Sequence, residues 1–441
     1  MAEIEKYEEP ELEKEDLEAG EEMYALADRL FPIGRSLTGE GVRESLRILQ
    51  EVMPGLKIKE VPCGTQVFDW TVPQEWEIED AYIEDEQGNR IIDYKVNNLH
   101  VMGYSVPVDK YVDLDELLTY IRVEETQPDV IPYVTSYYSR RFGFCMSKNQ
   151  RDSLKPGKYH CVIKSRHFDG VLNYGELLIP GKSEKEVLIS TYICHPSMAN
   201  NELSGPVLTA ALTKWIRQKE RNLSYRIVIV PETIGSIAYL SRNLEQMKKN
   251  TIAGFVLTCV GDDRTYTYLE SRNGDTLADK VLKNALEQLH PGYDFYSYLE
   301  RGSDERQYNA PGVDLPVVDF CRSKYGEFPE YHTSADNMDL ISPKGLAGSY
   351  QVMRQVLNAL EYNGYYKVTC LCEPQLGKRG LYPTESRKGI YAEVKKITNL
   401  IAYSDGKRDL IEISDKIHVP VEEMIPTLEK LLENGLLVKE K

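Results

Sequence analysis

The chain has 441 residues, of which 41% are hydrophobic, and a formal net charge of −17 at pH 7. This length suffices for two or three domains with hydrophobic cores. The negative charge argues against a general nucleic-acid or anionic-membrane binder, because both partners would be repelled. No apolar run is long enough to span a membrane, the N-terminus lacks the apolar region of a signal peptide, and the eight cysteines are scattered. We therefore expect a cytoplasmic protein with no membrane partner.

Two short helices are predicted near the N-terminus. Residues 1–20 hold nine acidic side chains against two lysines, which is typical of a solvated leader. Apolar residues then recur at helical spacing over 21–31 and 39–53, and a Pro-Gly pair ends the second helix.

A different pattern covers residues 57–181. Short alternating runs predict strands, for example at 81–84, 99–102 and 159–163, and turn sequences and many aromatic residues separate them. This pattern is typical of an all-β domain of sandwich or jelly-roll type. We expect such a domain to be inserted into the rest of the chain.

After residue 181, strand-like and helix-like runs alternate. Strands are predicted at 186–193, 225–231, 252–259 and 315–320, and helices at 204–217, 235–249, 275–290 and 344–363. Such alternation implies a mainly parallel sheet with helices on both faces. Residues 21–56 and 182–372 are therefore expected to form one α/β domain that the β-rich insert interrupts.

The C-terminal residues 378–441 resemble a winged helix. Helices are predicted at 387–403, 408–416 and 420–435, followed by a short strand. This region holds 12 Lys and Arg against 11 Asp and Glu, so it lacks the strongly basic face that reading DNA requires. We expect a packing or protein-interaction module, for a protein partner or a homo-oligomer, and consider nucleic acid an unlikely partner.

Polar side chains follow several predicted strands at the point where each strand ends. They are His195 with Asn200-Asn201-Glu202, Glu232, Asp262, and the turn Tyr331-His332-Thr333 with Asp304-Glu305 upstream. The carboxyl ends of parallel strands meet at the ligand-binding edge of such a sheet. Two histidines, an oxygen ligand and a spare glutamate are the parts of a catalytic zinc site, in which one position stays open for water.

Each of these residues also has a purely structural interpretation. His195 could be a hydrogen-bonded core histidine, and Glu202 and Glu232 could be acids that stabilise the start of a helix. A functional site is favoured because the alternative requires every one of these structural interpretations to be correct at once, at successive strand ends.

The order of the motifs resembles that of the zinc aminopeptidase superfamily, which includes bacterial leucyl aminopeptidases and glutaminyl cyclases. More closely, the chain resembles a bacterial family of aminopeptidase-like proteins associated with polysaccharide biosynthesis, with an inserted β-domain and a C-terminal winged helix. The resemblance rests on Cys194-His195-Pro196-Ser197 and on residues 68–73, 302–308 and 331–337.

The resemblance implies a zinc-aminopeptidase-like mixed sheet, with His195 and His332 as zinc ligands and Glu232 as the general base. Asp262 falls near the superfamily's third-strand acid ligand. Asn201 stands at the position of the superfamily's metal-bridging acid, and Thr233 stands at the position of the acid that ligates a second metal. The resemblance therefore implies one zinc rather than two, with an oxygen ligand from Asn201 or Asp262.

By the same resemblance, we expect a zinc-dependent amide hydrolase in which one zinc and Glu232 activate water. The substrate would be a small peptide or an amide-bearing sugar, with Asp304, Glu305 and Tyr331 in its pocket. Arg140 could reach from the insert to an acidic substrate group, although a surface salt bridge is its simpler interpretation. The alternative is a catalytically silent binding or regulatory protein for a peptide or an amino-sugar.

Overall fold

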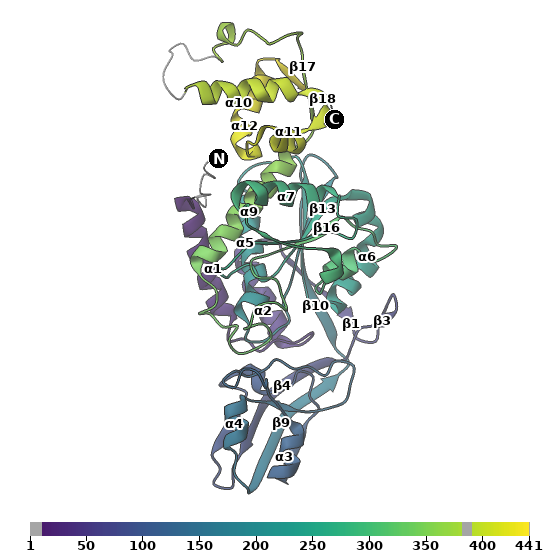
Figure 1. The fold of residues 1–441 in the computed structure, drawn as a ribbon. Helices are drawn as coiled ribbons and strands as arrows, with labels where there is room; N and C mark the ends of the chain where they lie inside the picture. The colour runs from purple at the N-terminus through teal and green to yellow at the C-terminus, as the bar shows by residue number, and fades with distance from the viewer. Residues whose placement is uncertain (1–10, 382–389, 441) are drawn as a thin grey trace.

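The computed structural model describes residues 11–381 and 390–440, and an eight-stranded mixed sheet lies at its centre (Figure 1). In sheet order the strands are β1 (Lys57–Pro62), β10 (Val171–Ile179), β12 (Ser224–Val230), β11 (Glu186–Tyr192), β13 (Thr251–Leu257), β16 (Val317–Cys321), β14 (Thr267–Leu269) and β15 (Asp294–Tyr296). The run β12-β11-β13-β16 is parallel, while β10 and β14 join it antiparallel on either side. Every residue of β11 is buried, as expected for a central parallel strand.

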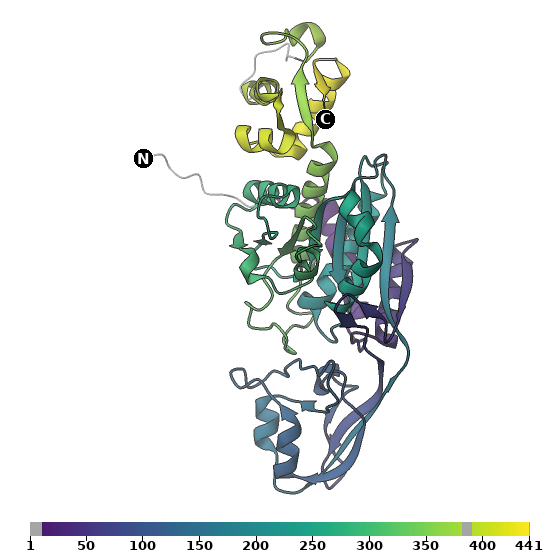
Figure 2. The ribbon, with the colours of Figure 1, turned by 90° about the vertical axis from the view of Figure 1, so that its right-hand side faces the viewer.

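Helices cover both faces of this sheet (Figure 2). On one face lie α1 (Lys14–Leu30), α2 (Glu40–Val52), α5 (Ser204–Ile216), α7 (Leu277–Leu289) and α9 (Pro343–Tyr362), and on the other lie α6 (Ile234–Asn250) and the short α8 (Glu305–Tyr308). Alternate residues of β12 supply the two cores, with Ile227 and Ile229 in one and Val228 and Val230 in the other. The predicted α/β sheet with helices on both faces is confirmed.

The first helix begins inside the stretch that was predicted to be a solvated leader. Helix α1 starts at Lys14, and Asp16 on it is buried and forms an ion pair with Arg354 of α9. The leader prediction is therefore wrong for residues 14–20, because a tertiary partner compensates the buried charge. Residues 1–10 lie outside the described part of the chain.

The insert is β-rich, as predicted, but it contains helices and one principal sheet. Strands β5 (Arg90–Asp93), β4 (Glu75–Glu84), β9 (Lys158–Phe168) and β6 (Val108–Asp113) form an antiparallel sheet, and two two-stranded ladders, β2 (Gln66–Val67) with β3 (Trp70–Thr71) and β7 (Ile121–Arg122) with β8 (Phe144–Cys145), add to it. Helix α3 (Leu114–Tyr120) packs on the four-stranded sheet through Leu117, and α4 (Lys148–Ser153) follows. A helix therefore stands where a sandwich would have its second sheet.

Two details of the insert differ from the predictions. Strands β1 and β10 pair with each other and with the large sheet, so the insert spans 63–170 rather than 57–181. The predicted strand at 99–102 is largely a 3-10 turn (Asn98–His100) that Asn97 caps. Alternating apolar residues do not reveal which sheet a strand joins, and a capping side chain can override the local strand preference.

The C-terminal module packs on the end of the α/β domain. It comprises α10 (Ile390–Tyr403), α11 (Leu410–Ile417) and α12 (Val421–Glu433), with strands β17 (Tyr365–Val368), β18 (Asp405–Asp409) and β19 (Leu437–Lys439). Because β17 pairs with the strands of this module, the α/β domain ends near the end of α9 and not at 372. The first residues of the helix predicted at 387–403 lie outside the described residues, which omit 382–389. Among the described residues, no helix has the length and apolar character needed to cross a membrane.

His290 makes stability depend on pH. Its ring is buried at the end of α7 and stacks on Tyr266, with ring centroids 3.6 Å apart, and burial together with the charge of Arg322 lowers the pKa of His290 to about 4. The folded chain therefore binds this proton more weakly than the unfolded chain, whose histidine titrates near 6.5. This contribution to stability is complete above pH 6.5 and is lost as the pH falls toward 4.

We expect the melting temperature of the wild type to fall more steeply than that of His290→Asn between pH 6.5 and pH 4. The difference in unfolding free energy accumulated over this range should be on the order of 2–3 kcal/mol. His418→Asn, on the exposed turn after α11, serves as the control and should follow the wild type. Parallel curves for the wild type and His290→Asn would contradict the assignment.

Candidate active site

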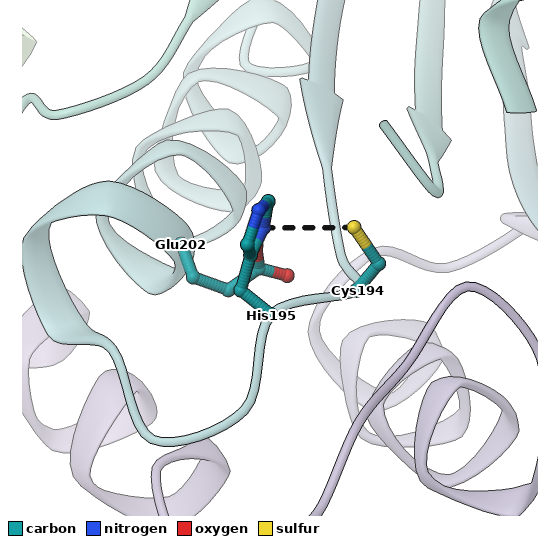
Figure 3. A group of neighbouring side chains, drawn as sticks. All are labelled: Cys194, His195 and Glu202. Carbon is teal, nitrogen blue, oxygen red and sulfur yellow. Dashed lines mark hydrogen bonds and ion pairs between the residues drawn. The ribbon is translucent and has the colours of Figure 1, made fainter. Parts of the chain in front are cut away.

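A buried carboxylate fixes the ring of His195, three residues beyond the end of β11 (Figure 3). The Nδ1 atom of His195 lies 2.6 Å from Oε2 of Glu202, and the two side chains are 5% and 0% exposed. A histidine that donates its Nδ1 hydrogen to a carboxylate holds one ring orientation and directs Nε2 elsewhere. Burial lowers the pKa of His195, but the neighbouring Cys194 and Glu202 outweigh it and raise this pKa well above its usual value.

Arg35 connects this pair to the N-terminal segment. Its guanidinium is fully buried, with Nε 4.0 Å from Oε1 of Glu202 and 3.0 Å from the carbonyl oxygen of His195, to which it donates. A buried cation at this distance offsets part of the cost of burying the Glu202 carboxylate. Sequence reasoning missed Arg35, because nothing in the loop between α1 and α2 indicates that it packs behind a strand end 160 residues away.

Glu232 faces the other nitrogen of His195. It lies two residues beyond the end of β12, and its Oε2 atom lies 3.6 Å from Nε2 of His195, with the Glu232 side chain 22% exposed. Burial raises the pKa of Glu232, although His195 and Arg306 oppose the shift. A carboxylate with a raised pKa is suited to accept and return a proton near neutral pH.

Four residues around the site have backbones that L-amino acids rarely adopt. They are Ser197 (φ 48°), Thr233 (φ 65°), Cys259 (φ 52°) and His332 (φ 55°). Thr233 is the most unusual, because a β-branched side chain is disfavoured at positive φ. Strain of this kind tends to gather at functional sites, where the surrounding structure imposes it.

His332 brings a second imidazole to the site. Its ring centroid is 5.5 Å from that of His195, and the ring stacks on Tyr331 at 3.9 Å. Burial and repulsion from His195 lower the pKa of His332 to about 3, so this ring is neutral. Its Nε2 atom is buried and has no hydrogen-bond partner among the described residues.

The insert covers this histidine pair with Tyr133. The Tyr133 ring makes edge contacts with both imidazoles, at centroid distances of 5.2 Å to His195 and 5.1 Å to His332. The backbone N–H of Tyr133 donates to the carbonyl of His332 at 2.8 Å, and its hydroxyl lies 2.8 Å from that of Tyr137. Sequence reasoning missed Tyr133, for which a general abundance of aromatics was the only signal. From the insert it named only Arg140 as able to reach the site, with a surface role as the simpler interpretation, and the exposed Arg140 side chain bonds to Gln74 within the insert.

The two predicted oxygen ligands differ in how their oxygens are used. The carboxylate of Asp262 accepts four hydrogen bonds, of 2.9–3.0 Å, from Asn200, Ser323 and Arg264. The amide oxygen of Asn201 accepts from the hydroxyl of Tyr192 at 3.0 Å, and the Tyr192 ring in turn lies 5.2 Å from that of His195. Asp262 thus anchors a loop, whereas only the Tyr192 side chain links Asn201 to His195.

Asp304 and Glu305, predicted to meet a substrate amine, are fully buried. Asp304 accepts hydrogen bonds from the backbone of Thr233 and the hydroxyl of Ser236, both at 2.8 Å. Glu305 turns back to the N–H of Gly302 at 2.7 Å and to the hydroxyl of Tyr325 at 3.1 Å. Asp304 therefore supports the start of α6 and Glu305 supports the loop before α8, and neither carboxylate is exposed to solvent.

The turn that carries Asn201 and Glu202 depends on Asp336. This π-helical turn (Ala199–Leu203) directs three backbone N–H groups, those of residues 199, 200 and 201, at the Asp336 carboxylate over 3.1, 2.6 and 2.9 Å. Burial raises the pKa of Asp336 to about 7 despite these bonds. The motif at 331–337 therefore supplies both an imidazole and the acceptor that shapes the opposite wall.

These features place the fold among aminopeptidase-like proteins. The zinc aminopeptidase BSAP from Bacillus subtilis has a TM-score of 0.57 at 13% identity, covering 77% of this chain and 94% of that chain. A crystal structure of a candidate peptidase from Clostridium acetobutylicum has a TM-score of 0.91 at 42% identity, covering 97% of this chain and 98% of that one. At 13% identity BSAP shows a common fold alone, whereas the second structure matches nearly the whole chain.

The chain belongs to the family described as a domain of unknown function, DUF4910, which residues 24–363 match. Residues 364–439 match a winged helix-turn-helix family. A Clostridium acetobutylicum relative, named as a candidate polysaccharide biosynthesis protein with aminopeptidase-like domain, is 45% identical over 403 residues, or 90% of this chain and 92% of the relative. The resemblance inferred from the sequence is confirmed, as is the C-terminal winged helix.

Asp336→Asn should loosen the turn behind His195, because an amide nitrogen would replace one of the two oxygens that accept the turn's N–H groups. We expect the unfolding free energy to fall by about 1–3 kcal/mol and hydrogen exchange to accelerate over residues 199–203. Asp339→Asn, a nearby exposed position, should change neither quantity. Unchanged exchange in Asp336→Asn would show that the carboxylate does not hold the turn.

Proposed function

We propose that the protein is a zinc-dependent amide hydrolase of aminopeptidase type that uses a single zinc ion. One observation carries the proposal: two buried imidazoles, His195 and His332, lie with ring centroids 5.5 Å apart, and the Glu232 carboxylate is 3.6 Å from Nε2 of His195. Imidazole nitrogens and one carboxylate or amide oxygen are the donors that a catalytic zinc site uses.

The residues present fit one zinc ion. His332 has a buried Nε2 atom without a partner among the described residues, and buried polar atoms of this kind call for an explanation such as an ion. Glu202 holds Nδ1 of His195, which leaves Nε2 for a metal. Asn201 is favoured over Asp262 as the oxygen ligand, because Asp262 already accepts four hydrogen bonds.

Cys194, His195 and Glu202 form another metal-type cluster, with donor atoms within 4.8 Å of one another (Figure 3). This cluster fits a metal poorly. Its histidine atom is Nδ1, which the 2.6 Å hydrogen bond to Glu202 occupies, and burial raises the pKa of the Cys194 thiol to about 11. A metal requires the thiolate, so the Nε2 side of His195 is the better site.

A second metal is not proposed. The position after Glu232, where a second carboxylate ligand would be needed, holds Thr233, and the Thr233 hydroxyl accepts a hydrogen bond from Arg306 at 2.8 Å. A guanidinium therefore already supplies positive charge at this place.

Zinc bound here would acidify water and polarise an amide carbonyl. Glu232 would take a proton on Oε2 and return it to the leaving nitrogen. Glu202 and Arg35 keep the His195 ring in place, and Tyr133 limits the access of bulk water. The Clostridium relative is named for polysaccharide biosynthesis, which supports an amide-bearing sugar as substrate, and a small peptide is the alternative. The eight free cysteines support a location in the cytoplasm.

The winged helix is proposed to be a packing or protein-interaction module rather than a DNA reader. Helix α12, the counterpart of a recognition helix, lies against α9, where Glu422 bonds to Asn358 at 3.2 Å and Glu429 to Tyr362 at 2.7 Å. One side of α12 is thus covered, and its acidic side chains would repel phosphate.

A second candidate function is ligand binding without turnover. It is favoured by the cover that Tyr133 places over the histidine pair, which would suit retention of a bound peptide or amino-sugar. The two candidates differ in what the loss of Glu232 should do.

If the hydrolase proposal holds, Glu232→Gln lowers kcat for aminoacyl amide hydrolysis by about 10²–10⁴-fold, because the proton acceptor is lost while the shape is kept. Zinc content by elemental analysis should remain one per chain. Glu327→Gln, an exposed control, should keep wild-type kcat. Ligand-dependent stabilisation with no turnover in the wild type would favour the binding protein instead.

Glu202→Gln should weaken zinc affinity by about 10–100-fold, since the carboxylate that orients His195 becomes neutral. Competition with a chromophoric chelator measures this affinity. Glu44→Gln, from α2, is the matched control and should bind zinc like the wild type. Equal affinity in Glu202→Gln would contradict the role of this pair, and failure of the wild type to bind zinc would sink the proposal.

A further inference from the structure

Arg306 is held rigidly beside Glu232 without an acidic partner. Its Nε donates to the carbonyl of Ser303 and its NH2 group to the hydroxyl of Thr233, both at 2.8 Å. Within residues 11–381 and 390–440, no carboxylate oxygen lies within 4.0 Å of the guanidinium nitrogens. Neutral acceptors thus fix the guanidinium without a direct ion pair, while Glu232 and Asp304 act on its charge from a greater distance.

The guanidinium retains donors for a ligand. An arginine has five N–H donors, of which the bonds to Ser303 and Thr233 use two. The side chain is half-buried, so it is neither freely solvated nor sealed in the core. A preorganised, partly desolvated guanidinium binds carboxylates strongly, because its planar fork offers two parallel hydrogen bonds.

The charge lies at the reacting end of the site. Thr233 directly follows Glu232, and the positive charge of Arg306 opposes the burial-driven rise in the pKa of Glu232. The same charge acts on the hydroxyl of Tyr331, next to His332. Arg306 is therefore close to where an amide held between Glu232 and the two imidazoles would lie.

The acids that could attract a substrate amine are turned away. Asp304 and Glu305 are fully buried. Oδ1 of Asp304 accepts from Thr233 and Ser236, and Glu305 accepts from Gly302 and Tyr325. Oδ2 of Asp304 has no hydrogen-bond partner among the described residues, but it is sealed from solvent. A free ammonium on the substrate would meet a fixed cation, which only Glu232 and the fully buried Asp304 offset. An anionic group would meet a guanidinium that has no direct ion pair.

We propose that Arg306 binds a carboxylate of the substrate next to the amide that is cleaved. The inference that the substrate contains an amide rests on the proposed function. The inference that the site recognises a carboxylate rests on Arg306 alone. The substrate class is then an N-acylated amino acid or acidic amino-sugar, in place of a peptide with a free N-terminal amine.

The test compares N-acetylglycine with N-acetylglycinamide, which differ only in the charge of one terminus. Binding to the zinc-supplemented full chain is measured by calorimetry or saturation-transfer NMR. N-acetylglycine should bind about tenfold more tightly, a preference that corresponds to one charge-assisted contact. Arg306→Gln should abolish the preference and Arg306→Lys should keep part of it. Arg301→Gln, an exposed arginine on the preceding loop, should leave it unchanged.

Equal binding of the two compounds, binding of neither at millimolar concentration, or a preference that survives in Arg306→Gln would each overturn the proposal. Methyl phosphate is tested as a further compound. If it binds more tightly than N-acetylglycine and this binding depends on Arg306, the group that Arg306 recognises is a phosphate and not a carboxylate. If Arg306→Gln fails to fold, as judged by circular dichroism, Arg306→Lys tests the proposal instead. A reduced preference for N-acetylglycine in Arg306→Lys supports it, and an unchanged preference contradicts it. Retained preference without hydrolysis of any amide would refute the hydrolase and leave the carboxylate site standing.

Discussion

The hydrogen bond between Glu202 and His195 is the constraint on which the rest of the site depends. Both side chains are buried and their atoms are 2.6 Å apart, so the ring of His195 has one orientation and one free nitrogen. A buried carboxylate is costly unless charge and hydrogen bonds compensate it. Arg35 from the N-terminal segment supplies the charge, and Asp336 shapes the turn that presents Glu202.

The site is assembled from parts of the chain that are distant in sequence. Arg35 comes from the loop between α1 and α2, Tyr133 from the insert, Arg306 from the first turn of α8 and His332 from the loop before α9. The large sheet makes this possible, because its parallel strands all end at one edge. The insert is therefore part of the site rather than an appendage, since Tyr133 contacts both imidazoles.

Strand ends were the most reliable guide to the site. His195 and Glu232 follow predicted strands, and the fold brings them within 3.6 Å of each other. Roles that depend on where a side chain points could not be predicted in the same way. Asp304 and Glu305 have residue types suited to binding an amine, yet both are fully buried and accept hydrogen bonds from backbone N–H groups, those of Thr233 and Gly302 respectively. The carboxylate of Asp262 likewise accepts hydrogen bonds from the side chains of Asn200 and Ser323.

The sequence by itself determined the alternation of the main strands and helices after residue 181, the two imidazoles and Glu232, and the neutral residues Asn201 and Thr233 where further acids would be needed for a second metal. Hydrophobic periodicity and residue chemistry are local properties, so they can be read along the chain. Only the tertiary structure decided that Arg35, Tyr133 and Arg306 join these residues, and that β1 and β10 belong to the large sheet. Burial and charge compensation act between distant segments, and no local pattern records them.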